Sequence, residues 1–327
     1  MNIQPQSLVW EQSTCDWCGS DKTRLLVEGP DRLERLPGTF RMVQCEQCGL
    51  IRQNPYLAWE SLQHYYTDGY YRDEQVSTYL KAKKETNPIR RWNRRYGSAK
   101  RLRAIHRHIK GGRMLDVGCG KGLFLEEGRA SGRWEVMGID PTEQACDFVR
   151  EILQIPVHFG TLVDFSPPEQ PFDLITLWNV LEHVPDPTAT IRRCNEMLVD
   201  GGLLVITIPN LEGIGNRVFG EYWVGWDLPR HTFIFSRSVL KTMLTELGFE
   251  VIDTRCLSTS YALLGHSLDF WSQSWESRYP ALRSLLLRIY HTLAVRIALL
   301  LPLWVLDKMR QTTLLTVFAR KIAPPHR

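Results

Sequence analysis

Leu115-Asp116-Val117-Gly118-Cys119-Gly120-Lys121-Gly122 is the stretch of sequence that decides the fold. It lies between a run that predicts a strand over residues 113–119 and a run that predicts a helix over 121–132. Glycines at such a turn let the backbone approach a ligand closely, and the first turn of the helix offers N–H groups that lack intrahelical partners. The stretch therefore predicts a ligand-binding loop between a strand and a helix.

Strands and helices alternate on both sides of this loop. Further strands are predicted at residues 134–140, 156–160, 172–180, 201–210, 249–256 and 313–321. Further helices are predicted at residues 98–110, 142–153, 188–198 and 236–248. Such alternation predicts an α/β fold in which helices wrap a parallel sheet and ligands bind at the carboxyl ends of the strands.

The acids around the loop indicate which ligand it binds. Asp140 ends the next predicted strand, where a carboxylate can accept both hydroxyls of a ribose. A nicotinamide fingerprint would need a third glycine at position 123, but that residue is Leu123. Asp116 would repel a pyrophosphate but suits the ammonium group of an amino acid. A nucleoside joined to an amino acid satisfies these conditions, and S-adenosylmethionine is such a molecule.

The motifs LDVGCGKG, GIDP, FDLITLWNVLEHVPDP and GGLLVITIPN resemble the successive motifs of class I S-adenosylmethionine-dependent methyltransferases. The resemblance covers about residues 100–260 and the last predicted strand. It implies a Rossmann-like, seven-stranded, mostly parallel sheet. The doubled C-x2-C pattern and the W-D-x-P-R-H block at residues 226–231 are similar to a bacterial group with an N-terminal zinc ribbon, of the methyltransferase domain 23 type. That group is often linked to surface polysaccharide or natural-product sugars.

The resemblance also implies which residues contact S-adenosylmethionine. They are Asp116, Gly118 and Gly120 along the methionine part, Asp140 at the ribose, Thr161 and Leu162 near the adenine, and Asn179 beside the cofactor.

A related group, the polyprenyl-benzoate O-methyltransferases of quinone synthesis, carries E-x-x-E-H after the fourth strand, linked to a divalent ion. The matching residues here are Asn179, Glu182 and His183. Because the first acid is replaced by an amide, one charged ligand is missing, and we do not expect a metal there.

Methyl transfer from a sulfonium mainly requires alignment of the reactants and exclusion of water. If the acceptor is a hydroxyl, a general base helps, and His183 and His231 are the candidate catalytic residues. His183 could instead only brace the following helix. We expect Arg230 to bind an anionic group of the substrate and Trp226 to line the acceptor pocket. The alternatives are that Arg230 pairs with Asp227 and that Trp226 packs in the core.

Four of the eight cysteines form two C-x2-C pairs, each followed by glycine: Cys15 and Cys18, then Cys45 and Cys48. Four thiolates at this spacing suit a tetrahedral structural Zn2+, and we prefer this interpretation to two disulfides. The scattered cysteines, Cys119, Cys146, Cys194 and Cys256, are expected to be buried, inert thiols.

The 327 residues are 43% hydrophobic and 23% charged, which excludes disordered, collagen-like and coiled-coil classes. We predict a zinc ribbon, an aromatic and basic linker, the cofactor-binding domain, an apolar helical insertion and the final strand of the sheet. Their respective ranges are 1–55, 56–97, 98–256, 257–311 and 312–322.

Two segments could form interaction surfaces. Residues 81–110 are strongly basic, and residues 281–306 read as one amphipathic helix with Arg288 and Arg296 on its polar face. Together they favour the surface of a membrane over nucleic acid, although a solvated face and a buried lid or dimer contact remain open. The N-terminus has no basic start followed by an apolar run. We therefore expect a cytoplasmic protein, peripheral on the inner face of the membrane.

These observations predict a methyltransferase whose acceptor is a small molecule, a sugar or lipid-linked metabolite of cell-surface or secondary metabolism. One alternative is methylation of RNA or protein, with the basic segment and the zinc ribbon as the docking surface. Another is a non-catalytic binding subunit that keeps the cofactor fold. The sequence does not determine the oligomeric state.

Overall fold

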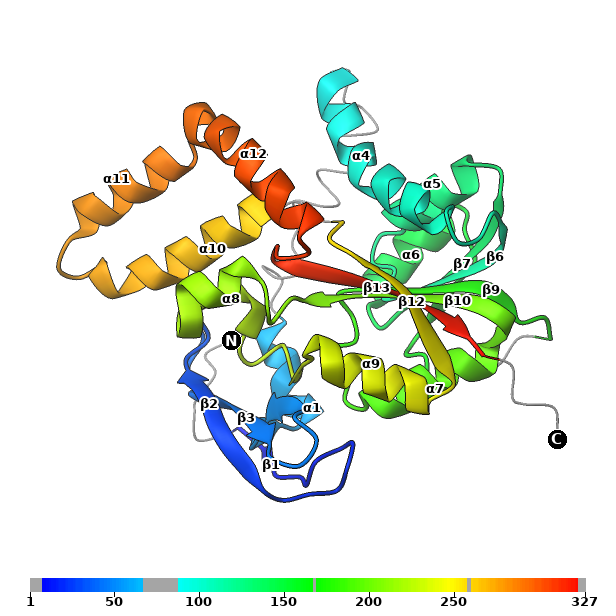
Figure 1. Ribbon diagram of the computed structural model, residues 1–327, viewed down its shortest axis with the longest axis horizontal. Helices are drawn as coiled ribbons and strands as arrows, with labels where there is room; N and C mark the ends of the chain where they lie inside the picture. The colour runs from blue at the N-terminus through cyan, green and yellow to red at the C-terminus, as the bar shows by residue number, and fades with distance from the viewer. Residues whose placement is uncertain (1–7, 67–87, 167–168, 258–259, 323–327) are drawn as a thin grey trace. The chain divides into compact units, whose positions relative to one another are not determined.

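A computed structural model describes residues 8–66, 88–166, 169–257 and 260–322 (Figure 1). The internal contacts divide the chain into two compact units. The ribbon unit comprises Met1–Tyr70, Ile208–Leu240 and Arg255–Leu315, and the sheet unit comprises Tyr71–Thr207, Lys241–Thr254 and Thr316–Arg327. This division differs from the predicted domain 98–256, because residues 208–240 pack with the N-terminal part of the chain.

The sheet has seven strands in the order β12-β13-β10-β9-β6-β7-β8. They are β6 (Gly112–Val117), β7 (Trp134–Asp140), β8 (Val157–Phe159), β9 (Phe172–Trp178), β10 (Leu198–Pro209), β12 (Phe249–Arg255) and β13 (Leu314–Lys321). The pairings from β10 through β9, β6 and β7 to β8 are parallel. Arg320 contacts Gly201 while Thr316 contacts Thr207, so β13 runs antiparallel to β10. The predicted seven-stranded, mostly parallel sheet is confirmed.

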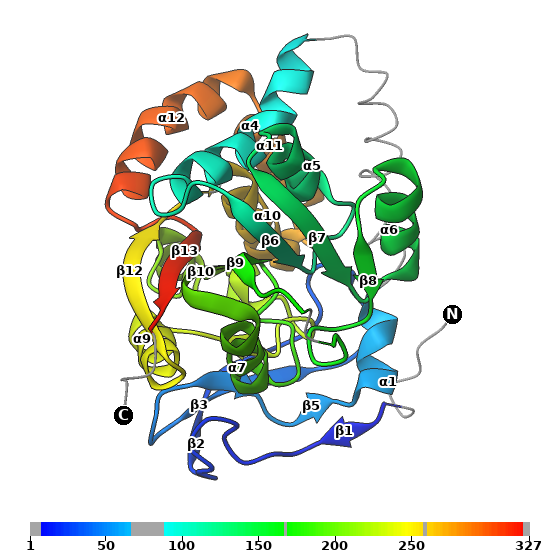
Figure 2. The ribbon, with the colours of Figure 1, turned by 90° about the vertical axis from the view of Figure 1, so that its right-hand side faces the viewer.

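Helices cover both faces of this sheet (Figures 1 and 2). One face carries α4 (Pro88–Ile105), α5 (Leu123–Ala130) and α6 (Glu143–Asp147), and the other carries α7 (Pro187–Met197) and α9 (Arg237–Glu246). The first of these helices begins earlier than the predicted 98–110. Asp186 caps α7 by accepting a hydrogen bond from the N–H of Ala189 at 2.8 Å, and Pro187 fits its first turn. Helices on both faces explain why β9 and β10 are apolar along most of their length.

The ribbon unit contains a four-stranded sheet in the order β11-β4-β3-β2. Its strands are β2 (Thr23–Gly29), β3 (Phe40–Cys45), β4 (Ile51–Gln53) and β11 (Phe233–Ile234). All three pairings are antiparallel. A second ribbon pairs β1 (Trp10–Glu11) with β5 (Tyr56–Leu57), and α1 (Trp59–Leu62) and the 3-10 turn η2 (Gln63–Tyr65) follow. One strand of this module thus comes from a segment almost two hundred residues later in the chain.

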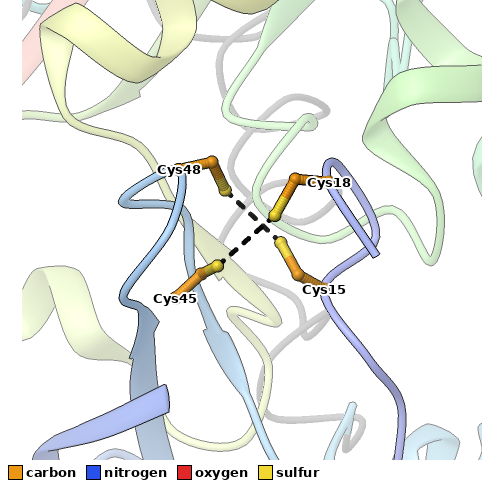
Figure 3. A group of neighbouring side chains, drawn as sticks. All are labelled: Cys15, Cys18, Cys45 and Cys48. Carbon is orange, nitrogen blue, oxygen red and sulfur yellow. Dashed lines mark hydrogen bonds between the residues drawn. The ribbon is translucent and has the colours of Figure 1, made fainter. Parts of the chain in front are cut away.

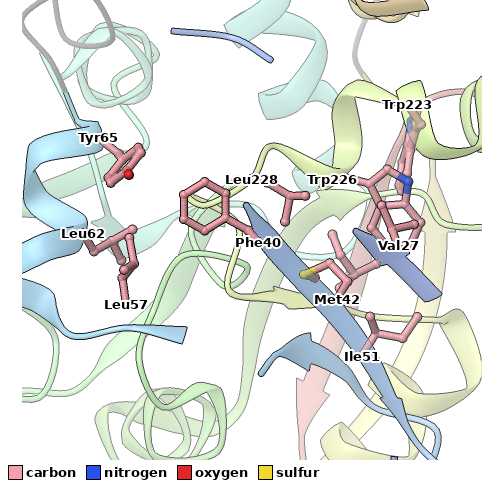
Figure 4. Packing of buried hydrophobic residues seen from close by; sticks show 11 residues of the cluster. Val27, Phe40, Met42, Ile51, Leu57, Leu62, Tyr65, Trp223, Trp226 and Leu228 are labelled. Atoms are coloured by element: carbon pink, nitrogen blue, oxygen red, sulfur yellow. The ribbon is translucent and has the colours of Figure 1, made fainter. Parts of the chain in front are cut away.

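An apolar cluster joins these distant segments. Phe40, Met42 and Ile51 from the N-terminal strands pack with Trp223 and Trp226 (Figure 4). The two indole rings meet edge to face at 5.4 Å, and the Nε1–H of Trp226 donates to the carbonyl oxygen of Gly220 at 2.9 Å. This environment matches the alternative for Trp226, which is core packing.

Helices of the ribbon unit lie before and after β12. They are α8 (Ile214–Phe219), the 3-10 turns η4 (Gly220–Tyr222) and η5 (Val224–Trp226), α10 (Ser260–Ser272), η6 (Gln273–Trp275), α11 (Pro280–Tyr290) and α12 (Leu293–Lys308). The predicted helical insertion before the last strand is confirmed. Residues 281–306, however, are two helices bent by 62° rather than one. Arg288 and Arg296 therefore do not share the continuous polar face that a single helix would give.

Membrane-span criteria of length and hydropathy are not met by any single helix among the described residues. The bent pair formed by α11 and α12 meets them jointly.

Candidate functional site

The glycine loop joins β6 to α5 and has three glycines with positive φ. The values are +66° at Gly118, +50° at Gly120 and +69° at Gly122. A Cβ at Gly118 would lie 2.5 Å from Val180, whereas nothing lies within 4 Å of a Cβ at Gly120. The first glycine is therefore required by packing against the turn after β9, while the second leaves open space beside its backbone.

Asp140 fixes the shape of this loop from the end of β7. Its Oδ2 accepts a hydrogen bond from the N–H of Gly120 at 2.7 Å, and its Oδ1 accepts one from the N–H of Thr142 at 2.9 Å. Burial raises the pKa of Asp140, and these two backbone donors oppose the rise. Each oxygen keeps a second lone pair, so the carboxylate can still accept a bond from a ligand hydroxyl.

Asp116 is buried at the end of β6. Its Oδ1 accepts a hydrogen bond from the hydroxyl of Thr176 at 2.5 Å. Burial raises the pKa of Asp116 to about 7, and the hydroxyl of Thr176 and the charge of Arg101 oppose this. The guanidinium of Arg101 lies 4.4 Å from the ring centroid of Trp178, and burial lowers the pKa of this arginine while Asp116 raises it.

Sequence analysis did not single out Arg101. It is one of many basic residues in the segment 81–110, and nothing local separates it from its neighbours. The signal that could have found it is its place on the helix that precedes β6, where its side chain is half-buried while that of Arg103 is exposed. Residues 81–87 of that segment lie outside the described residues, as do the side chains of 88–95.

The turn after β9 carries the second group of predicted residues. Asn179 has a φ of +58°, and its side-chain amide donates to Glu182 at 3.3 Å. Glu182 is fully buried, and the N–H of His183 donates to the carbonyl of Val180 at 2.9 Å. Because Val180 packs on Gly118, this turn lies next to the glycine loop, and His183 follows Val180 by three residues.

Thr161 and Leu162 follow β8. The N–H of Gly160 donates to the carbonyl oxygen of Asp140 at 3.0 Å, which brings this loop beside the acid. Thr161 donates to Asp164 from its hydroxyl at 2.6 Å, and Leu162 is buried. The predicted cofactor residues thus lie at or just after the carboxyl ends of four adjacent strands, β9, β6, β7 and β8.

The residues present fit S-adenosylmethionine. Asp140 supplies an acceptor for ribose hydroxyls, and the backbone at Gly120 is open to a ligand. Asp116 and Arg101 supply opposite charges for the ammonium and carboxylate of an amino acid. A site of this composition suits a nucleoside joined to an amino acid, with Leu162 as an apolar neighbour for the base.

Arg230 and His231 belong to the ribbon unit. Arg230 is fully buried, and its guanidinium donates to Asp31 at 2.7 Å, to Asp227 at 2.7 Å and to the carbonyl of Tyr65 at 3.2 Å. Burial opposes the charge, but the two aspartates raise the pKa of Arg230 above its usual value. This arrangement matches the structural alternative for Arg230, and it adds Asp31, which sequence analysis missed because the partner is distant in sequence.

His231 is buried as well. Its Nδ1 lies 2.8 Å from the carbonyl oxygen of Gly225, which requires a proton on that nitrogen. Burial lowers its pKa, so the ring is neutral at neutral pH. Gln53 donates from its side-chain amide to the carbonyl oxygen of His231 at 2.7 Å, which fixes the backbone of the W-D-x-P-R-H block against β4.

The four predicted zinc ligands converge (Figure 3). The sulfur atoms of Cys15 and Cys48 are 3.5 Å apart, as are those of Cys18 and Cys45, and all four lie within 4.8 Å of one another. Tetrahedral zinc with Zn–S bonds of about 2.3 Å separates its sulfurs by about 3.8 Å. The sulfurs are too far apart for disulfides, so the cluster fits a zinc ribbon.

The four thiols of this cluster differ in their electrostatics, because burial raises the pKa of Cys15 and of Cys48. Although burial opposes it, the backbone N–H groups of Cys48 and Gln47 and the thiol of Cys18 lower the pKa of Cys45 to about 7. The scattered cysteines, by contrast, are buried as expected. Burial raises the pKa of Cys119 and of Cys194, which keeps both thiols protonated.

Comparison with known proteins adds independent information. A family model described as a methyltransferase domain matches residues 89–254. The ubiquinone biosynthesis O-methyltransferase of Bradyrhizobium sp. (strain ORS 278) is 32% identical over 175 residues, covering 51% of this chain and 67% of that protein. The protein of the same name from Neisseria meningitidis serogroup C (strain 053442) is 29% identical over 177 residues, covering 48% and 74%. A solved SAM dependent methyltransferase from Archaeoglobus fulgidus matches with a TM-score of 0.47 and 17% identity, covering 70% of this chain and 94% of that one.

Proposed function

Because the chain belongs to this methyltransferase family and is an S-adenosylmethionine-dependent enzyme, we propose that it transfers the methyl group to a hydroxyl oxygen of a small-molecule acceptor. The observation that carries the proposal is the similarity to relatives named O-methyltransferases. The matching family model covers residues 89–254, which include the glycine loop, Asp140 and His183. Membership of an enzyme family supports an enzyme over the alternative of a non-catalytic subunit.

The proposed acceptor is a sugar or a lipid-linked metabolite. The relatives are named for ubiquinone biosynthesis, and their name supports a small molecule over RNA or protein. The cluster of four cysteines, which fits a zinc ribbon, supports the resemblance to methyltransferases of surface and natural-product sugars.

Four groups of the sheet unit are assigned to cofactor binding. Asp140 accepts hydrogen bonds from the ribose, and the backbone at Gly120 contacts the ligand. Asp116 attracts the ammonium and Arg101 the carboxylate of the methionine part. The bound cofactor supplies a sulfonium methyl that is already activated, so these residues need only orient it and keep water away.

His183 is assigned the role of general base. It lies after β9 in the turn that packs on the glycine loop through Val180, and an imidazole can take the proton of a hydroxyl as the new oxygen–carbon bond forms. His231 remains a second predicted base. The cysteine cluster is proposed to hold one structural Zn2+, because four protein sulfurs leave no open coordination position for chemistry.

The test is methyl transfer from radiolabelled S-adenosylmethionine to phenols, sugar nucleotides, polyprenyl-linked sugars, RNA and protein. We expect label in one of the small-molecule pools, at least about tenfold less with Asp140→Asn, and a loss of about a hundredfold in kcat with His183→Asn. Asp147→Asn, at a half-exposed side chain, and His266→Asn, at an exposed residue, are the matched controls.

Label confined to RNA or protein would overturn the proposed acceptor class. A His183→Asn enzyme with an unchanged kcat and an unchanged pH profile would remove the assignment of the base. Methyl transfer to nitrogen or carbon, read from the product by mass spectrometry, would contradict O-methylation.

A further inference from the structure

The two helices α11 and α12 expose an unusual number of large apolar side chains. Neither helix has a buried residue. Ten large apolar side chains on or just after these helices are at least 41% exposed: Leu282, Leu285, Ile289, Leu293, Ile297, Leu300, Leu301, Trp304, Val305 and Met309. So many exposed apolar side chains on two neighbouring helices of a folded protein mark a binding surface rather than a solvated one.

The half-buried face of α12 is apolar too. Val295, Leu299, Leu303 and Leu306 form it at helical spacing. The helix is therefore apolar on the side that packs against its own unit and on the side that faces outward. A helix that is apolar on its outer side as well needs an apolar partner there.

Basic groups border this surface. Between residues 280 and 310 the sequence has five basic residues, Arg283, Arg288, Arg296, Lys308 and Arg310, and a single acid, Asp307. Arg288, Arg296 and Lys308 are exposed, and the ammonium of Lys308 lies 5.6 Å from the ring centroid of Trp304. An apolar surface with a tryptophan and flanking cations is complementary to the interface of an anionic bilayer.

The helices are held firmly in this arrangement. The rings of Tyr261 in α10 and Tyr290 in α11 stack at 4.8 Å, and each hydroxyl donates to the other residue's carbonyl oxygen at 2.5 Å. Arg283 pairs with Asp269, and Arg296 lies over the ring of Tyr261 at 5.7 Å. The apolar side chains therefore lie on two helices that these contacts fix to α10.

Both ends of the insertion emerge at one point. The N–H and the hydroxyl of Thr313, which follows α12, both donate to the hydroxyl oxygen of Ser260 at the start of α10, each at 3.2 Å. A single crossing of a bilayer by α11 and α12 would place these two residues on opposite sides. At about 1.5 Å per residue, the 16 residues of α12 also span only about 24 Å, less than the hydrocarbon thickness of about 30 Å.

We propose that α11 and α12 insert side-on into the interface of an anionic lipid bilayer and dock the enzyme on a membrane surface without crossing it. A second copy of the chain fits less well, because a symmetric contact would bring the same basic groups of each copy together. Arg288, Arg296 and Lys308 instead reach phosphate headgroups while the apolar side chains lie below them.

The test is flotation of the purified full-length protein with vesicles of phosphatidylcholine, with or without phosphatidylglycerol. We expect binding to the anionic vesicles that weakens with salt, and a drop of more than about tenfold for Ile297→Glu combined with Leu301→Glu. Arg296→Glu combined with Lys308→Glu should weaken binding to anionic vesicles selectively. Val218→Glu, an exposed apolar residue of α8, is the matched control and should bind like the wild type.

Calorimetric titration with S-adenosylmethionine checks that each variant is folded. It also separates a loss of membrane binding from a loss of cofactor binding. No flotation of wild-type protein, or equal flotation of the Ile297→Glu, Leu301→Glu variant that still binds the cofactor, would overturn the proposal. So would a concentration-dependent dimer, seen by analytical ultracentrifugation without lipid, that the same variant converts to a monomer.

Discussion

Gly118 and Gly120 differ in what surrounds their α-carbons, although the sequence presents them as equivalent members of one motif. Val180 fills the space beside the first, and the space beside the second is open. The buried carboxyl of Asp116 likewise differs from Asp140, whose two oxygens are both held by backbone N–H groups. Each of these residues therefore has a separate, measurable role.

Alanine at the two glycines should separate stability from cofactor binding. Gly118→Ala forces a contact with Val180 at positive φ and should lower the free energy of unfolding by about 2 kcal/mol or more. Gly120→Ala should cost only about 1 kcal/mol of backbone strain but weaken S-adenosylmethionine binding at least about tenfold. Urea unfolding and calorimetric titration measure the two effects, and equal cofactor affinity in Gly120→Ala and wild type would contradict the assignment.

Asp116 should make the stability of the cofactor-free protein depend on pH. Its pKa is about 7 in the folded protein and about 3.9 in an unfolded chain, so the folded state holds more protons between these values. This contribution to stability is fully present below about pH 4 and is lost as the pH rises through 7.

Asp116→Asn removes that loss. The variant should gain stability relative to wild type on going from pH 5 to pH 8, by on the order of 2 kcal/mol in urea unfolding. Asp147→Asn, at a half-exposed side chain, is the control. A difference between Asp116→Asn and wild type that stays constant with pH would show that this carboxyl does not titrate in the window.

At the scale of elements, the ribbon sheet is completed by a strand from another part of the chain. The N–H of Gln53 in β4 donates to the carbonyl of Thr232 at 2.9 Å, and β11 then pairs with β4. The turn that carries Cys45 and Cys48 connects β3 to β4. Metal binding at the cysteines should therefore stabilise β11, although β11 carries no cysteine.

Removal of the metal should change hydrogen exchange in strands that carry no cysteine. A chelator is expected to release one Zn2+ per chain and to speed hydrogen exchange at least about tenfold for the amides of β4 and β11. The amides of β9 in the sheet unit serve as the internal reference. Release of no zinc, or exchange that changes at the cysteine turns but not at Phe233 and Ile234, would contradict this coupling.

At the scale of the whole molecule, the chain is divided into units that are not continuous in sequence. Arg230 joins Asp31 to Asp227 within the ribbon unit, across about two hundred residues. The same unit contains the apolar cluster and the proposed membrane-docking helices. Its integrity therefore depends on long-range contacts more than on the local ribbon.

Arg230→Met should leave two buried carboxylates without their cation and cost about 3–5 kcal/mol of unfolding free energy. Arg41→Met, which breaks an exposed pair with Glu28, should cost at most about 1 kcal/mol. Urea unfolding, followed by tryptophan fluorescence, compares the two. Equal costs would show that the buried pairs are not structurally important and would reopen a substrate role for Arg230.

The sequence by itself determined the sheet, the cofactor loop and the cysteine cluster. These features depend on local periodicity, on glycines at a strand–helix turn and on ligand spacing within a few residues, all of which are written in short stretches such as 115–122. Only the tertiary structure showed that Arg101 lies near Asp116, that Arg230 is enclosed by Asp31 and Asp227, and that β11 joins the ribbon. It also showed the bend between α11 and α12. A single sequence shows no pattern for contacts between residues that are distant along the chain. It also shows no pattern for burial, which decides whether a charged side chain pairs within the protein or binds a ligand.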